Sequence, residues 1–177
     1  MLFSERSLWT MLHGIGLGGG ALLALTAVLS ALYLMRPGRD SPTSSRDPSI
    51  PIAAAAAFAA VMVWLTTLVG TYVVFPSYRA APPEGATDLG RYPRSMLLAE
   101  PATAWLHTFA METKEHLPFV AGMLATAVAF VAWRYRRRFL DDRYIRRLGT
   151  AFLVVCFGIV AYVSLLGVFV NKVAPLE

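Results

Sequence analysis

The sequence predicts an all-α integral membrane protein, a four-helix bundle with an extended third helix and a proline-rich external loop. Hydrophobic residues make up 56% of the 177 residues and charged residues only 15%, and the mean hydropathy is +0.55. This composition excludes a disordered chain and is too apolar for an ordinary soluble domain. Four stretches without Asp, Glu, Lys or Arg are each long enough to cross a hydrocarbon core of roughly 30 Å. They are residues 7–35, 49–78, 116–133 and 148–171.

The whole chain is expected to form one transmembrane domain, residues 1–177, without a soluble domain. A stop signal, Arg36-Pro37-Gly38, ends the first span, and Pro76 is expected to end the second. The external loop, residues 76–101, contains five prolines, and a loop of this length can cover the helix ends or meet a partner. The expected spans cover about residues 8–35, 50–75, 104–133 and 148–171.

The third helix is expected to be longer than a membrane requires. Its pattern stays helical over residues 102–134, which corresponds to roughly 50 Å. Charged residues within 112–115 indicate that its outer part projects into water and that the membrane begins near His116. Pro118 removes a backbone donor just below that point, which predicts a kink.

The distribution of charge predicts the orientation. Ten of the sixteen Lys and Arg residues fall in the loops that follow the first and third spans, and seven of the eleven acidic residues fall on the opposite side. Because basic residues collect on the cytoplasmic side, both termini are expected on the outer side. The sequence pI near 9.7 then reflects a loop facing anionic lipid and does not indicate nucleic-acid binding.

Several function classes find no support in the motifs. The single cysteine, Cys156, excludes an intrachain disulfide and a cysteine-based metal cluster. No nucleophile elbow, phosphate loop or dinucleotide fingerprint occurs, which argues against a hydrolase or a nucleotide-driven pump. The chain also lacks an inverted repeat and an ionisable residue near the membrane centre, so a transporter is disfavoured.

The three histidines, His13, His107 and His116, all fall at the outer ends of the first and third spans. His13 and His116 lie at matched depth on helices that run in the same direction. A haem b needs such a pair of imidazoles, one on each side of the iron. His107 lies nine residues before His116, on the opposite side of the helix. It is interpreted as an interfacial residue or as the ligand of a second, more exposed site.

Glycines accompany the first histidine. Gly16 and Gly20 follow His13 by three and seven residues, so they share its helix face. Such a stripe can let a flat macrocycle lie against the backbone, and it equally suits close helix packing. Basic residues on the outer side are candidates to pair with haem propionates.

A metal-ion site is the competing interpretation of the third helix. His107 with Met111, and Glu112 with His116, are i, i+4 pairs that each line one helix face. Histidine with methionine suits copper, and histidine with glutamate suits zinc, iron or manganese.

Polar and aromatic side chains also occur in the second span, where they favour helix packing, with contact to a quinone headgroup as the alternative. They are Trp64, Thr66, Thr67, Thr71 and Tyr72.

The chain resembles small bacterial b-type cytochrome membrane subunits that anchor or feed larger redox complexes. The resemblance rests on the four spans and on the two histidine segments LHGIGLGGG and METKEHLPF. Members of that family often carry two haems and four histidines, whereas this chain has three. The resemblance therefore implies one complete haem b site, carried by His13 and His116, in a bacterial inner membrane.

These observations together predict a haem b protein that carries electrons near the outer face of a respiratory or photosynthetic complex. Its expected partners are other membrane subunits, the lipid bilayer and, as the alternative above, a quinone. Two further hypotheses are a non-catalytic accessory subunit and a periplasmic-side protein that binds copper or zinc.

Overall fold

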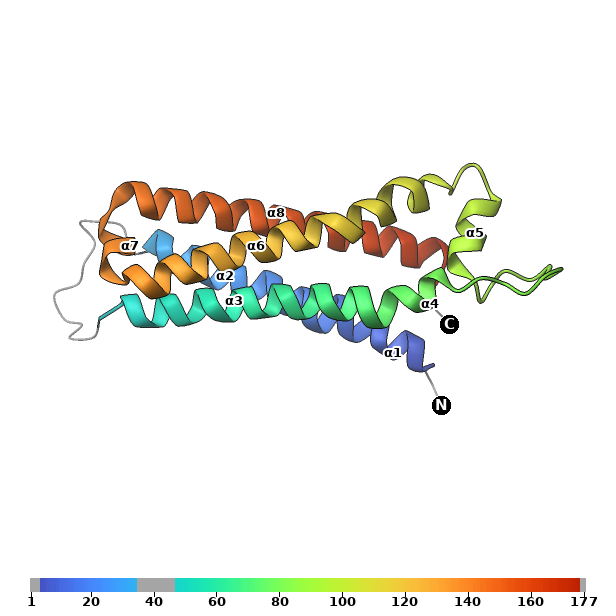
Figure 1. Ribbon diagram of the computed structural model, residues 1–177, viewed down its shortest axis with the longest axis horizontal. Coiled ribbons are helices and arrows are strands. Elements are labelled where there is room, and N and C mark those ends of the chain that lie inside the picture. Colours follow the sequence, from blue (N-terminus) through green and yellow to red (C-terminus); the bar gives the residue numbers. More distant parts are fainter. Residues whose placement is uncertain (1–3, 35–46, 176–177) are drawn as a thin grey trace.

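The computed structural model describes residues 4–34 and 47–175. All regular secondary structure in these residues is helical. Four long helices lie side by side, and the described chain ends lie at the same end as the short helix α5 (Figure 1). Each long helix is apolar and long enough to cross a membrane, which confirms the prediction of an all-α, multi-pass protein. They are Glu5–Leu34, Ser49–Arg79, Leu106–Tyr135 and Arg143–Val173.

Three of the long helices contain a π-helical stretch. The first helix comprises α1 (Glu5–Met11), the π stretch η1 (Leu12–Gly18) and α2 (Gly19–Leu34). The second comprises α3 (Ser49–Val69), η2 (Gly70–Val74) and α4 (Phe75–Arg79). The third comprises η3 (Leu106–Met111) and α6 (Glu112–Tyr135), and the fourth is α8 (Arg143–Val173). Two short helices connect them, α5 (Pro93–Ala99) and α7 (Arg137–Asp141).

Two predicted boundaries are wrong. The second helix does not end at Pro76. The π-helical stretch η2 lies directly before this proline and accommodates its missing N–H, so the helix continues to Arg79. The third helix starts at Leu106, since residues 101–104 form turns, and it continues through Pro118 without a break. Helix α5 within the loop was not predicted. The stop signal expected after the first span lies outside the described residues.

The core between the long helices consists of small and branched side chains. Helix α3 packs against α2 and α6, and α8 also packs against both, so α2 and α6 lie diagonally across the group. Buried alanines along α3 allow close approach of its neighbours. The buried core includes Leu25, Val63, Ala125 and Leu153.

Several glycines act as notches that receive a larger side chain. A methyl group added at Gly122 would lie 2.8 Å from the Trp64 ring, and one at Gly149 would lie 2.7 Å from the Phe139 ring. At Gly20 it would lie 2.6 Å from Met62. Gly20 therefore serves helix packing, one of the two roles its spacing predicted.

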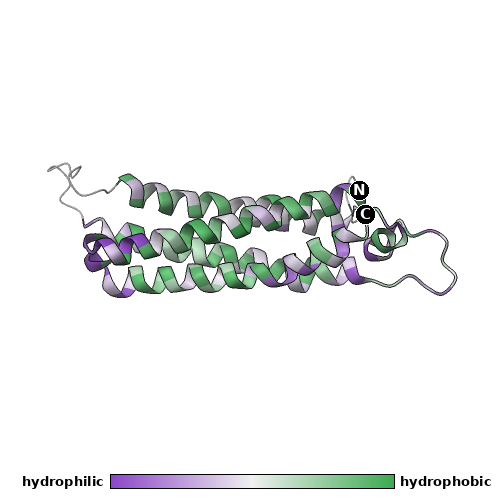
Figure 2. Cartoon of the chain, turned by 90° about the horizontal axis from the view of Figure 1, so that it is seen from above, coloured by the Kyte–Doolittle hydropathy of each residue, from purple (hydrophilic) through white to green (hydrophobic). Residues whose placement is uncertain are grey.

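Hydrophilic residues concentrate at the two ends of the helix group and apolar residues between them (Figure 2). At the end that carries α7, the Arg137 guanidinium lies 3.2 Å from the Asp47 carboxylate. The backbone N–H of Ser49 also donates to Asp47, and together these contacts lower the pKa of Asp47. Asp142 caps α8 by accepting from the backbone N–H groups of Tyr144 and Ile145.

Candidate functional site

His13 lies in η1 and faces the second helix. The Thr66 hydroxyl lies 3.3 Å from the backbone oxygen of His13, to which it donates, and 3.4 Å from His13 Nδ1. A hydroxyl has one proton, so this arrangement is satisfied when Nδ1–H donates to Thr66 Oγ1. Nε2 then keeps its lone pair. The Cε1 edge of the ring lies against Gly70, where a methyl group would come within 2.6 Å.

The Lys114 ammonium enters the same region from α6. It occupies a notch at Gly167 of α8, where an added methyl would lie 2.6 Å from Nζ. Its charge acts on the His13 imidazole. Within the described part of the chain, no hydrogen bond or ion pair involves the Lys114 side chain. An ammonium packed between helices without a carboxylate partner is costly, so such a residue marks a candidate functional site.

Hydroxyl groups complete this region. Gly18 of η1 lies beside the Thr66 and Ser164 hydroxyl oxygens, each 3.8 Å from a methyl group placed there. All four long helices thus contribute a polar side chain. We call this group, formed by His13, Thr66, Lys114 and Ser164, the His13 cluster.

A second polar group lies beneath the loop, where His107 is 7% exposed and Tyr78 is 2% exposed. The Arg94 guanidinium of α5 donates from Nε to His107 Nε2 over 3.3 Å. Because a guanidinium only donates, Nε2 is the acceptor and the proton of the neutral ring is on Nδ1. Nδ1–H then donates to the Tyr78 hydroxyl oxygen over 2.9 Å. We call these three residues the His107 network, and both ring nitrogens are occupied within it.

His116 is exposed on α6. Its Nδ1–H donates to the backbone oxygen of Glu112 over 2.7 Å, which leaves the Nε2 lone pair free. Val120 and Met123, also exposed, follow it by four and seven residues and share its face. Lys114 lies about 200° around the helix and points inward. The structure therefore does not bring His116 next to His13, and a haem between the two stays a prediction.

The residues of the alternative metal site are also divided between two faces. His107 and Met111 are buried, whereas Glu112 and His116 are exposed. Among the described residues, no group of three or more His, Cys, Asp or Glu side chains is placed to hold a metal ion. Gly16 is exposed, and a methyl there would approach only Leu12 of its own helix.

A cavity of about 240 Å³ lies one helical turn above the His13 cluster, between the start of the first helix and the end of the second. Arg6 lines it and precedes His13 by seven residues, so the two share a helix face. The cavity is lined by Glu5, Arg6, Trp9, Thr10, Val73, Val74 and Ser77.

Two polar side chains of the second span make internal hydrogen bonds. Trp64 Nε1–H donates to Thr126 over 2.9 Å, and Thr67 donates to the backbone oxygen of Val63 over 2.8 Å. These contacts agree with the packing interpretation. Tyr72 is exposed, and contact with a quinone stays a prediction.

No protein-family model, curated protein or solved structure matches this chain. The His13 cluster offers an imidazole nitrogen with a free lone pair and a cation without a carboxylate partner. Such a pair can bind a metal centre and an anionic or hydrogen-bond-accepting group.

Proposed function

We propose that this chain is a haem b protein of a bacterial inner membrane and that it carries electrons within a respiratory or photosynthetic complex. In this proposal the long helices form a transmembrane bundle, with both termini and the loop 76–101 on the outer side. Other membrane subunits or a quinone are the electron partners. The His13 cluster carries the proposal, because a purely structural subunit does not need an ammonium and an imidazole between its spanning helices.

His13 has the properties of a residue that would hold the haem iron. Thr66 accepts the Nδ1–H hydrogen bond, and such a partner fixes the ring orientation and the tautomer of a ligating histidine. Nε2 is then the nitrogen available to iron, and the haem would supply the redox chemistry. Lys114 and Arg6, which have no carboxylate partner among the described residues, suit the two propionates.

Haem binding requires some rearrangement of this structure. The cavity above His13, at about 240 Å³, is smaller than the roughly 300–1,000 Å³ of most ligand pockets. Helices α1 and α4 would have to separate. His116 is the second residue that would hold the iron, since its Nε2 is also free. It can reach the haem only if α6 turns about its axis.

A reduced-minus-oxidised visible spectrum of the purified full-length protein tests the proposal. We expect a stoichiometric b-type signal that is lost in His13→Ala and in His116→Ala and is retained per folded protein in His107→Ala, the control. Absence of haem from a fully assembled sample, or a signal that survives His13→Ala, would contradict the proposal. If His13→Ala loses the b-type signal and His116→Ala keeps it, the haem proposal stands and His116 is rejected as its ligand.

A non-catalytic accessory subunit is the second candidate. The outward face of α6, which carries exposed Val120, Met123 and Phe130, favours it because such a face can pack against another membrane subunit. This function predicts a fully assembled complex in which the chain holds no haem.

A further inference from the structure

A second cavity, of about 350 Å³, lies at the arginine-rich end of the molecule between α6, α7 and α8. Its inner wall includes the buried residues Val128, Phe139 and Gly149, whereas Ala127 and Leu148 on its rim are exposed. The cavity therefore opens away from the core, toward the side of the helix group that faces lipid in a membrane.

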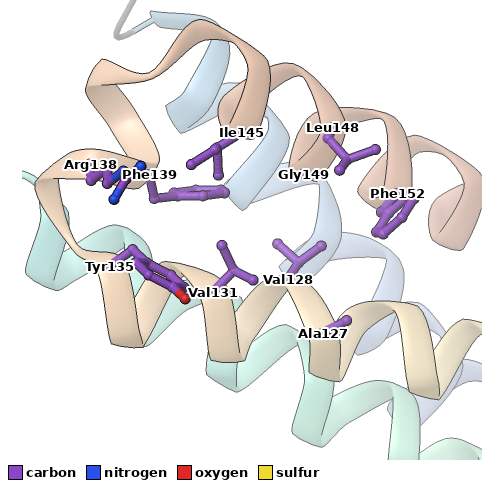
Figure 3. Close-up of a pocket in the computed structure, with 10 residues that line it drawn as sticks. All are labelled: Ala127, Val128, Val131, Tyr135, Arg138, Phe139, Ile145, Leu148, Gly149 and Phe152. Atoms are coloured by element: carbon purple, nitrogen blue, oxygen red, sulfur yellow. The ribbon is translucent and has the colours of Figure 1, made fainter.

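Figure 3 shows apolar side chains of α6 and α8 facing each other across this cavity, with Arg138 and Tyr135 near one end. The Phe139 ring lies against Gly149, where a methyl group would come within 2.7 Å. Phe139 is only 2% exposed, so this wall is fixed by packing before any ligand arrives.

Arg138 lines the cavity and, like Arg147 outside it, has no side-chain partner among the described residues. Other arginines at this end are engaged. Arg137 pairs with Asp47, Arg146 donates to the backbone oxygen of Leu140, and Arg136 lies 4.4 Å above the Trp133 ring. Among the described residues, no comparable contact engages the Arg138 guanidinium. An exposed cation thus lies at the mouth of an apolar cavity.

We propose that this cavity binds one acyl chain of an anionic phospholipid whose phosphate is held by Arg138. The apolar walls suit a hydrocarbon chain, and a guanidinium matches a phosphate with two parallel hydrogen bonds. The volume falls within the usual range of ligand pockets. Basic pockets between spanning helices are known to select anionic headgroups. This site is independent of the haem.

Native mass spectrometry of the full-length protein with phosphatidylglycerol or phosphatidylcholine tests the site. Wild type should retain phosphatidylglycerol about fivefold better than phosphatidylcholine, the preference expected for one arginine beside a headgroup with a net negative charge. Both lipids have the phosphate, but choline cancels its charge in phosphatidylcholine. Arg138→Gln should lose this preference. Arg147→Gln is the matched control, because Arg147 is exposed, lies at the same end and does not line the cavity. It removes the same charge and should leave the preference unchanged.

A second variant tests the cavity itself. Ala127→Trp fills the exposed rim and should abolish retention of both lipids without changing the melting temperature. Three results would overturn the proposal: no lipid retained by wild type, equal effects of Arg138→Gln and Arg147→Gln, or displacement of the lipid by inorganic phosphate alone. The last result would indicate a phosphate site that needs no acyl chain.

Discussion

The His13 cluster and the His107 network use the same residue type in opposite ways. Each histidine lies in a π-helical stretch, a local geometry that often accompanies functional sites. His107 has both ring nitrogens engaged, by Arg94 and Tyr78. His13 keeps Nε2 free beside an ammonium without a carboxylate partner in the described structure. The comparison teaches that the partner of Nε2 separates a structural histidine from a candidate ligand.

The two groups also differ in what they connect. The His107 network joins α4, α5 and η3, so it ties the loop 76–101 to the ends of two long helices. The His13 cluster joins all four long helices, but its charged member makes no compensating contact that the structure describes. We expect the His107 network to stabilise the fold. We expect the His13 cluster to lower the free energy of unfolding, because it is kept for function.

The largest expected effect is that of His107→Ala. This change leaves the buried Tyr78 hydroxyl without its partner and opens a cavity, so the free energy of unfolding should fall by about 2–4 kcal/mol. Denaturation in mixed detergent measures this free energy of unfolding. An unchanged transition would show that the network does not hold the loop.

Gly70→Ala should have the next largest effect, because the added methyl meets the His13 ring at 2.6 Å. We expect a loss of about 1–3 kcal/mol in the free energy of unfolding from overpacking, together with a displaced His13 ring. Gly19→Ala is the control, since a methyl there has no atom within 4 Å. Equal stability of the two variants would show that His13 is not packed on Gly70.

Lys114→Met should act in the opposite direction. Removing a charge without a carboxylate partner should raise the free energy of unfolding by about 1 kcal/mol. The same change should reduce the haem content. Lys172→Met, at an exposed position near the end of α8, is the control. It should change neither the free energy of unfolding nor the haem content. Destabilisation by Lys114→Met would reveal a partner for the ammonium and remove the contrast between the two groups.

The smallest effect concerns Asp47, which lies outside both groups. The Ser49 N–H and the nearby Arg137 lower its pKa, so its ionised form stabilises the folded state above the ordinary aspartate pKa. This contribution is lost as the pH falls through the lowered value. The melting temperatures of wild type and Asp47→Asn should therefore converge at acid pH. A difference that persists there would indicate that the Asp47 carboxylate is not responsible.

Hydropathy predicted the four long helices because each contains a run of residues without charge, and such a run has few alternatives to a spanning helix. The boundaries were harder to predict. Pro76 has the pattern of a stop, yet the helix continues through it because the adjoining π-helical stretch η2 accommodates the missing N–H. The π-helical stretches left no recognised signal in the residue pattern.

The candidate site was predicted only in part. His13 stood out because histidines are few and lie at one end of the chain. The sequence pattern places Lys114 in water because it lies between Glu112 and Glu115, whereas the structure turns it inward, against Gly167 of α8. The contacts of Tyr78 and Arg94 with His107 join residues distant in sequence, and no local pattern encodes them.

The most direct test measures the free energy of unfolding and the haem content of His13→Ala and His107→Ala in the same preparations. We expect His107→Ala to be strongly destabilised while its folded fraction keeps the b-type signal, and His13→Ala to lose the signal with little change in the stability of the haem-free protein. The reverse pattern, with His107 required for haem and His13 for stability, would contradict the distinction between the two groups.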